Sequence, residues 1–314
     1  MQPTPYVMTD DDKRFFQDNG YFGPFKVYEP DEAQDIWKRI RLKLLDTSNQ
    51  MFPNTRINYD RHMDVSELSD HVSRPEIVNR IQGLIGPDIL CWRTEFFSKM
   101  QGEPGTEWHQ VESYSYASGK AALVPTVRRD KTPMELTVWT ALTEANRENG
   151  CMKFMPGSHK KWYFDERRGL SPASDYRDGK KTAFFGYHYA ELKIDPSWEP
   201  DESQAVILEM KPGEAVVFTA RCMHGSLPNT SKRKIRVAFA SRYAPTDVRI
   251  YPDPTDLSRQ QDSFTEHGEL FDLSRHGNVL VSGADRYAHN RIATANFEGK
   301  PFATLPAVVD AGVL

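Results

Sequence analysis

Residues 106–111 read Thr-Glu-Trp-His-Gln-Val and contain half of a metal-site pattern. In the 2-His-1-carboxylate site of non-haem Fe(II) proteins, a His-x-Asp triplet on a strand is joined by a second histidine far downstream. Residues i and i+2 of a strand point the same way, so both side chains of the triplet reach one metal. Here His109 takes the first position, but Val111 stands where the carboxylate is expected. The chain therefore has the pattern with one ligand missing.

A second histidine completes the pair. His224 follows the apolar run 215–219 and precedes a glycine, which suits a ligand at a strand end in the mouth of a barrel. Glu112 is the carboxylate nearest to His109, but it faces away if the segment stays extended and reaches the metal only through a bulge or a turn. A zinc hydrolase would need a third strong protein ligand, and none is evident. The sequence predicts a metal held by His109 and His224.

Two arginines follow the second histidine on one apolar strand. Arg236 and Arg242 are separated by an even number of residues and so share a face of that strand. A buried cation needs an anion, and a dicarboxylate co-substrate would provide one through a bidentate salt bridge. A structural ion pair with a protein acid is the alternative for either arginine. Thr106 and Trp139 are further candidate hydrogen-bond donors to the same carboxylate.

Composition places the 314-residue chain among ordinary globular proteins, with 39% hydrophobic and 27% charged residues. The net charge of −4 argues against nucleic acid as the main partner. No stretch approaches the roughly 20 apolar residues of a membrane-spanning helix, so no membrane partner is expected. The acidic N-terminus lacks an export signal, which predicts a cytoplasmic protein. Three widely spaced cysteines form no zinc or disulfide pattern: Cys91, Cys151 and Cys222.

Helical patterns come first along the chain and strands follow. Helices are predicted to begin after Thr9 and at Pro30, and a third is predicted from Pro75 to about Leu84. From residue 88 onward, short apolar and β-branched runs separated by turn signals predict six strands: Ile89–Phe97, Leu136–Leu142, Cys151–Met155, Ala205–Glu209, Ala215–Thr219 and Ile235–Tyr243. This order indicates a mainly β fold with flanking helices, a sandwich or jelly roll.

We expect these elements to form a single domain over residues 1–314. It would consist of an N-terminal helical buttress (1–87), a jelly-roll core (88–250) and a C-terminal extension (251–314). The polar region at about 157–204 is expected to be an insertion between strands, of the kind that forms lids or binding loops.

Seven stretches carry a family resemblance: Gly-Tyr-Phe-Gly-Pro-Phe (20–25), Trp-Lys-Arg-Ile-Arg-Leu-Lys-Leu-Leu-Asp (37–46), Leu-Cys-Trp-Arg-Thr-Glu-Phe-Phe (90–97), Gly-Thr-Glu-Trp-His-Gln (105–110), Thr-Val-Trp-Thr-Ala-Leu-Thr-Glu-Ala-Asn (137–146), Phe-Phe-Gly-Tyr (184–187) and Phe-Ala-Ser-Arg-Tyr (239–243). Together they resemble the phytanoyl-CoA dioxygenase-like branch of Fe(II)/2-oxoglutarate enzymes. Within that branch the chain is most similar to the halogenases of nonribosomal peptide assembly lines. The resemblance extends over roughly residues 10–300.

The resemblance implies a double-stranded β-helix, or cupin-type jelly roll, with Fe(II) at His109 and His224. It implies that 2-oxoglutarate chelates the iron and that its distal carboxylate pairs with Arg242, beside Thr106 and Trp139. In these halogenases Ala or Gly replaces the Asp and chloride binds iron in its place. Oxygen drives decarboxylation of 2-oxoglutarate, and chlorine is transferred to an unactivated carbon. The usual substrate is an aminoacyl thioester on a peptidyl carrier protein, and a free small molecule is the alternative.

The sequence departs from this pattern at Val111, which is bulkier than Ala or Gly. Three outcomes follow from the extra bulk. Chloride still fits after a rotation or backbone shift, or water fills the position and favours hydroxylation or another oxidation, or metal binding fails and the protein is silent. Tyr114 and Tyr116 follow Val111 closely in the sequence and are candidates for the halide pocket. Phe184 and Phe185 are candidates for the wall of the substrate pocket.

Overall fold

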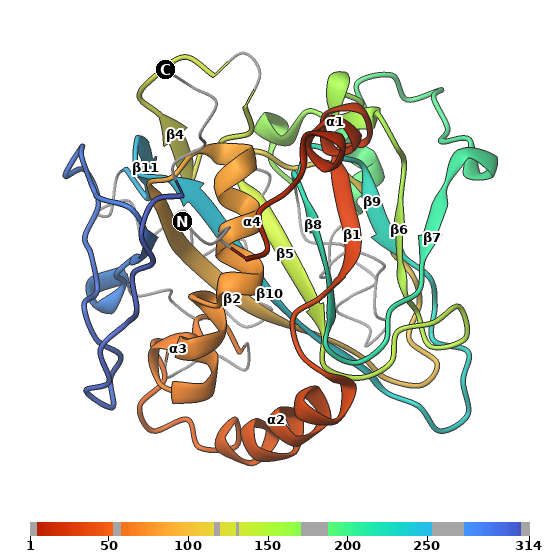
Figure 1. Ribbon diagram of the computed structural model, residues 1–314. Coiled ribbons are helices and arrows are strands. Elements are labelled where there is room, and N and C mark those ends of the chain that lie inside the picture. Colours follow the sequence, from red (N-terminus) through yellow and green to blue (C-terminus); the bar gives the residue numbers. More distant parts are fainter. Residues whose placement is uncertain are drawn as a thin grey trace.

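Two antiparallel sheets face each other in a computed structural model that describes residues 5–52, 58–115, 120–129, 132–170, 188–252 and 273–308 (Figure 1). The larger sheet comprises β1 (Tyr21–Lys26), β8 (Glu214–Phe218), β5 (Leu136–Ala141), β10 (Arg236–Pro245), β2 (Ile89–Lys99) and β12 (Val279–Ser282), in that order. The smaller comprises β3 (Thr106–His109), β9 (His224–Ser226), β6 (Met152–Phe154) and β7 (Val206–Leu208). A separate pair joins β4 (Leu123–Pro125) to β11 (Val248–Ile250). This is a jelly roll, and the predicted fold class is confirmed.

Helices cover the outer face of the larger sheet. The α-helices of the described residues are α1 (Asp10–Asn19), α2 (Pro30–Lys43), α3 (Ser66–Val72) and α4 (Pro75–Ile85). Short 3₁₀ helices are η1 (Arg61–Met63), η2 (Ser158–Lys160), η3 (Glu166–Arg168), η5 (Tyr189–Leu192), η6 (Glu202–Gln204) and η7 (Leu273–Arg275). The predicted ends of α1 are confirmed, because Thr9 forms a capping box with Asp12 and Gly20 ends the helix in the left-handed conformation at φ 83°. The three predicted helices correspond to α1, α2 and α4, whereas α3, with seven residues, is too short for a periodic pattern.

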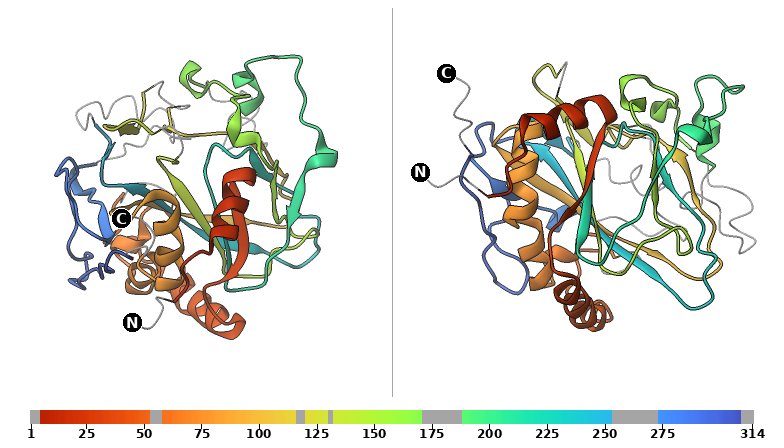
Figure 2. Two further views of the ribbon diagram at one scale, coloured as in Figure 1. Left: turned by 45° about the horizontal axis from the view of Figure 1, so that its top comes forward. Right: turned by 45° about the vertical axis from the view of Figure 1, so that its right-hand side comes forward.

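The two faces of the larger sheet bury different cores. Outward-facing side chains such as Val138 and Phe239 pack against the helices, including Ile77 and Ile81 of α4. Inward-facing side chains form a second cluster with the smaller sheet: Trp139, Val216, Phe218, Ala238 and Ala240 lie with Phe154. The right-hand view of Figure 2 shows the helices and the smaller sheet on opposite sides of the larger sheet. The pocket lined by His109 and His224 lies on the inner face, between the sheets.

The larger sheet extends beyond residues 88–250 at both ends. β1 pairs with β8 near the N-terminus, and β12 pairs with β2 near the C-terminus. Both strands are short and were not predicted as part of the core, since a run of four to six residues gives little periodicity. Within the predicted insertion, residues 171–187 lie outside the described part of the chain.

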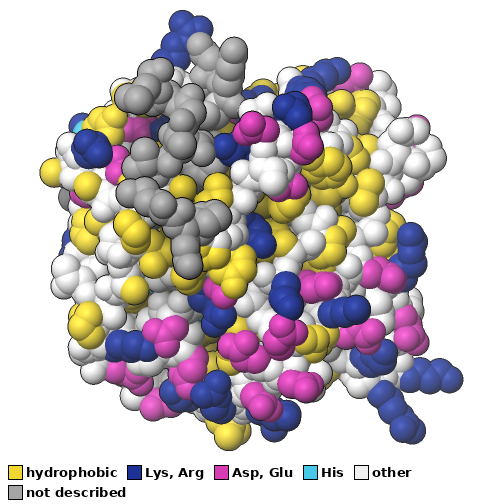
Figure 3. Space-filling view, in the orientation of Figure 1, with side chains coloured by type: hydrophobic (Ala, Val, Ile, Leu, Met, Phe, Trp, Pro, Cys, Tyr) yellow, Lys and Arg dark blue, Asp and Glu magenta, His cyan; other side chains and the backbone are white. Residues whose placement is uncertain are grey.

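Charged side chains of both signs alternate over the face shown in Figure 3, without a large patch of one sign. This agrees with the small net charge of −4. None of the helices in the described ranges combines the length and apolar character needed to cross a membrane.

Candidate functional site

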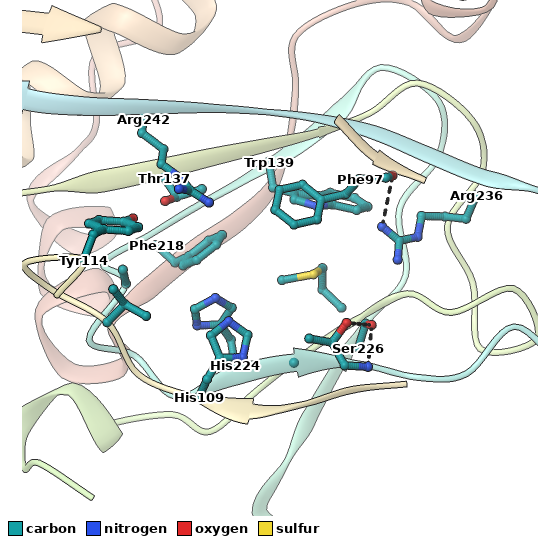
Figure 4. A pocket seen from close by; sticks show the side chains of 15 residues that line it. Phe97, His109, Tyr114, Thr137, Trp139, Phe218, His224, Ser226, Arg236 and Arg242 are labelled. Atoms are coloured by element: carbon teal, nitrogen blue, oxygen red, sulfur yellow. Dashed lines mark hydrogen bonds between the residues drawn. The ribbon is translucent and has the colours of Figure 1, made fainter. Parts of the chain in front are cut away.

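His109 and His224 form a cross-strand pair that connects β3 to β9. Their ring centroids lie 4.1 Å apart, and both side chains line a pocket between the two sheets (Figure 4). The Nδ1 atom of His109 lies 2.8 Å from the carbonyl oxygen of Glu107, and that of His224 lies 2.7 Å from the carbonyl oxygen of Cys222. A carbonyl oxygen only accepts, so each ring carries its proton on Nδ1 and Nε2 is the acceptor nitrogen. This is the tautomer that ligates a metal.

Burial keeps both imidazoles neutral. It lowers the pKa of His109 to about 4 and that of His224 well below its usual range. Neutral imidazole is the form that donates to a metal ion. Within the described ranges no group of three or more His, Cys, Asp or Glu side chains could hold a metal. The structure therefore brings together the two predicted histidines without a protein carboxylate.

Val111 occupies the place of the missing ligand. Its side chain lines the same pocket and is 4% exposed, and its N–H donates to the carbonyl oxygen of Ala220 at 2.9 Å. Glu112 does not line this pocket and lies 3.7 Å from the guanidinium group of Arg221. Glu112 thus does not substitute for the carboxylate.

A β-bulge places Thr106 beside the histidines. Thr106 pairs with Ser226 and His109 pairs with His224, so three steps on β3 match two steps on β9. The extra residue turns Thr106 and His109 to the same side, although residues three apart on a regular strand face opposite ways. The Ser226 hydroxyl donates to Oγ1 of Thr106 at 2.9 Å.

The two arginines lie at opposite ends of the pocket, with the histidines between them (Figure 4). Arg242 lies at the end of the pocket formed by Thr137 and Tyr114, and its Nη2 atom is 2.8 Å from Oε2 of Glu95. A protein acid therefore pairs with Arg242, which is the alternative that the sequence left open. The sequence gives no sign of this, because Glu95 lies on β2, more than a hundred residues away in the chain.

Arg236 has a different environment. It is 3% exposed, its Nη1 donates to the carbonyl oxygen of Phe97 at 3.4 Å, and its guanidinium carbon lies 5.1 Å from the ring centre of Trp139. Its Nε has no hydrogen-bond partner, and no carboxylate lies within ion-pair distance among the described residues. Burial lowers its pKa to about 10, so the side chain remains a cation at neutral pH. A buried cation of this kind calls for an anion in the pocket.

Tyr114 lines the pocket at the Arg242 end. The guanidinium carbon of Arg242 lies 4.9 Å from its ring centre. Its backbone has φ 58°, a left-handed conformation that is uncommon outside glycine. The predicted candidates Tyr116, Phe184 and Phe185 lie outside the described residues.

Several pocket residues were missed from the sequence, namely Phe97, Thr137, Met152, Phe218, Ala220 and Ser226. Thr137 could have been found, since it lies two residues before Trp139 and so shares its face. The others lie in strands or, in the case of Ala220, just after β8, and the sequence does not reveal how those strands pair.

Gln110 anchors the segment between His109 and Val111. Its Nε2 donates to the carbonyl oxygens of Ser158, Lys161 and Arg221 at 3.1, 3.0 and 2.9 Å. Its Oε1 accepts from the N–H of Tyr163 at 2.8 Å. The side chain is wholly buried. Its amide joins the segment that carries His109 to the segments around residues 158–163 and residue 221.

We expect Gln110→Ala to lower the free energy of unfolding by about 2–4 kcal/mol, because it leaves several buried backbone groups without partners. Urea denaturation measures the change. Gln204→Ala, at an exposed position, is the control and should stay within about 0.5 kcal/mol of the native protein. Equal stability of the two variants would contradict an anchoring role for Gln110.

Residues 16–238 match the family model for phytanoyl-CoA dioxygenase (PhyH). The chain belongs to this family. Among curated members, the PhyH chain is 26% identical over 190 residues to the peroxisomal phytanoyl-CoA dioxygenase of Rattus norvegicus, a match covering 58% of this chain and 47% of the rat protein. It is 23% identical over 214 residues to the 2-aminoethylphosphonate dioxygenase of uncultured bacterium HF130_AEPn_1, covering 68% and 67% of the two chains.

Solved structures extend this comparison. The structure described as CytC3 with Fe(II) and alpha-ketoglutarate is 36% identical to the PhyH chain, with a TM-score of 0.75 over 97% of this chain and 99% of CytC3. The non-heme monooxygenase ThoJ, at 21% identity and a TM-score of 0.62, covers 91% of this chain and 89% of its own and shares the fold.

The PhyH chain is thus an Fe(II)/2-oxoglutarate-dependent oxygenase. Its residues fit both groups, since His109 and His224 present neutral acceptor nitrogens to one pocket and Arg236 supplies a buried cation for a dicarboxylate.

Proposed function

We propose that the protein is an Fe(II)/2-oxoglutarate-dependent halogenase that chlorinates an unactivated aliphatic carbon of an amino acid. The observation that supports this is Val111, which lines the pocket of the two histidines where a carboxylate normally completes the ligand set. A missing carboxylate removes one ligand and one negative charge from the site. Chloride replaces both, whereas water replaces only the ligand.

The chain-wide resemblance to the halogenases of nonribosomal peptide assembly lines, such as the syringomycin threonyl halogenase, supports the same proposal. The usual substrate of those enzymes is an aminoacyl thioester on a peptidyl carrier protein, and we propose this substrate here. A free amino acid is the alternative, and assays with both forms distinguish the two.

The distal carboxylate of 2-oxoglutarate is assigned to Arg236 rather than to Arg242. Arg236 is buried without a carboxylate partner, while Glu95 already neutralises Arg242. Thr106 and Trp139 line the same pocket, Trp139 beside Arg236, and both would donate hydrogen bonds to this carboxylate. This arrangement leaves the Arg242 end of the pocket for the halide.

In this proposal the histidines, Arg236 and the apolar pocket residues have separate roles. His109 and His224 would hold the iron, which supplies the oxidation of the substrate with O2 as co-substrate. Arg236 orients 2-oxoglutarate by charge pairing. Apolar side chains of the inner core, such as Phe97 and Phe218, line the pocket and exclude water from the reacting groups.

Product analysis tests the proposal. The protein is incubated with Fe(II), 2-oxoglutarate, O2 and chloride, with the amino acid free or carrier-bound. A chlorinated product that becomes brominated when bromide replaces chloride is the expected result. Products changed only by +16 or −2 mass units in saturating chloride would identify a hydroxylase or other oxidase, the second candidate, which the bulk of Val111 favours. Absence of iron-dependent succinate formation with every substrate would identify a catalytically silent protein.

Val111→Ala should strengthen chloride binding to the anaerobic Fe(II)/2-oxoglutarate complex by at least about fivefold, since relief of crowding by two methyl groups is worth about 1 kcal/mol or more. Calorimetric titration with chloride measures the affinity. Val124→Ala removes the same two methyl groups at a site that does not line the pocket and serves as the control. Unchanged affinity in the Val111 variant would show that valine does not limit access.

A further inference from the structure

Glu135 is buried directly behind the Arg242 end of the pocket. It precedes β5 and continues the row of inward-facing residues formed by Thr137 and Trp139, because strand residues two apart face the same way. The residue is 2% exposed. Its Oε1 accepts a hydrogen bond from the Thr137 hydroxyl at 2.7 Å, and its Oε2 has no hydrogen-bond partner among the described residues. A buried carboxyl group is costly to ionise when one of its oxygens accepts no hydrogen bond.

The charges around Glu135 do not offset a second carboxylate. Arg242, from β10, faces it, but Arg242 is already paired with Glu95 of β2 at 2.8 Å. His109 and His224, from β3 and β9, are neutral at physiological pH. An ionised Glu135 would therefore add net negative charge beside the pocket.

The carboxyl group of Glu135 titrates near neutrality. Burial raises its pKa to about 7, against the charge of Arg242 and the hydrogen bonds of Thr137 and Tyr114. Burial also raises the pKa of Tyr114 well above its usual range, so its phenol remains a hydrogen-bond donor at working pH. The neighbouring side chains named above keep their charge near pH 7. Glu135 is thus the group in this cluster that changes charge there.

Two hydroxyl groups connect Glu135 to the position beside Val111. Thr137 and Tyr114 both line the pocket together with Val111 and Arg242. The left-handed backbone of Tyr114 is held by Glu166, whose carboxylate accepts from the N–H of Ser113 at 2.8 Å and from its hydroxyl at 2.7 Å. The placement of the phenol is therefore built into the loop that follows β3.

We propose that Glu135 determines which ligand fills the position beside Val111. As a neutral carboxylic acid it admits an anion such as chloride, and as a carboxylate it repels the anion and leaves the position to water. Binding of the halide is then coupled to the uptake of one proton from solvent by Glu135. This inference rests on the proposed function and names the residue that sets its choice between halide and water.

The test is a calorimetric titration of the anaerobic Fe(II)/2-oxoglutarate complex with chloride at pH 6 and pH 8. In the native protein the apparent Kd should be about tenfold larger at pH 8, because the neutral fraction of a group with a pKa of about 7 falls tenfold over this range. Glu135→Gln, a neutral side chain of the same shape, should bind chloride with equal affinity at both pH values. At pH 8 it should bind about tenfold more tightly than the native protein.

Two further variants sharpen the test. Glu112→Gln removes a carboxylate that faces Arg221 instead of the pocket, and should keep the native pH dependence. Thr137→Val removes the hydrogen bond that favours the ionised form of Glu135, so the midpoint of chloride binding should move to higher pH. This second route remains informative if Glu135→Gln folds poorly.

Equal chloride affinity of Glu135→Gln and the native protein at pH 8 would overturn the inference, including the case in which neither binds chloride. A failure of the proposed function has a different signature. If the native protein only hydroxylates while Glu135→Gln gains chloride binding, Glu135 sets ligand choice as inferred and the native enzyme is not a halogenase.

Discussion

Arg236→Met should weaken binding of 2-oxoglutarate to the Fe(II)-loaded protein by at least about thirtyfold. Removing one partner of a buried, hydrogen-bonded charge pair costs about 2–5 kcal/mol, and about 1.4 kcal/mol corresponds to a factor of ten. Arg236 is the cation that lines the pocket, is 3% exposed and lacks a carboxylate partner among the described residues. Anaerobic calorimetric titration with 2-oxoglutarate measures the affinity.

Three comparison variants define what the result means. Arg236→Lys keeps the charge but not the bidentate geometry and should lose less affinity. Arg221→Met removes an arginine outside this pocket and should bind 2-oxoglutarate normally. Native affinity in Arg236→Met, together with a loss in Arg242→Met, would place the distal carboxylate at the Arg242 end and contradict our assignment.

His224→Ala should lower the affinity for Fe(II) by more than about a hundredfold. Loss of an outer partner of a metal ligand already costs about 10–100-fold, and here one of two protein ligands is removed. The described residues offer no replacement, because no group of three or more His, Cys, Asp or Glu side chains among them could hold a metal. Equilibrium dialysis against Fe(II) under anaerobic conditions gives the affinity.

His159→Ala is the matched control for this variant. His159 is a histidine that lines a different pocket, with Nε2 3.1 Å from the carbonyl oxygen of Gln17. It should bind iron like the native protein. If His224→Ala retained native iron affinity, the metal would not lie between the two predicted histidines.

The histidine pair was predictable because each histidine lies in a sequence context that is typical of a metal ligand. The sequence shows one histidine in a strand pattern and a second histidine at the end of another strand. Antiparallel pairing of the two strands then places the histidines opposite each other. The jelly roll was predictable for the same reason, since its longer strands, such as β2 and β10, show clear apolar runs.

The roles of the arginines were not predictable, because they depend on residues from other strands. Their even spacing places Arg236 and Arg242 on one face of the strand. It does not reveal that they lie at opposite ends of one pocket. Only the register of β10 with β2 shows that Glu95 neutralises one of them, and Glu95 is distant in sequence.

The bulge in β3 and the placement of Glu135 were also beyond the sequence. The extra residue in β3 turns Thr106 to the face opposite to the one it would have in a regular strand. The residue types in β3 do not predict this bulge. Glu135 shares the parity of Thr137 and Trp139, but its significance comes from its burial and from the pairing of Arg242, the cation that faces it, with Glu95.

The central claim is that an exogenous halide completes the metal site beside Val111. Crystals of the anaerobic Fe(II)/2-oxoglutarate complex grown in bromide test it most directly, because bromide gives an anomalous scattering signal of its own. The account predicts a bromide peak bound to the iron and facing the Val111 side chain, at the end of the pocket formed by Arg242 and Tyr114. Water or a protein carboxylate in that position, with no anomalous peak at saturating bromide, would contradict it.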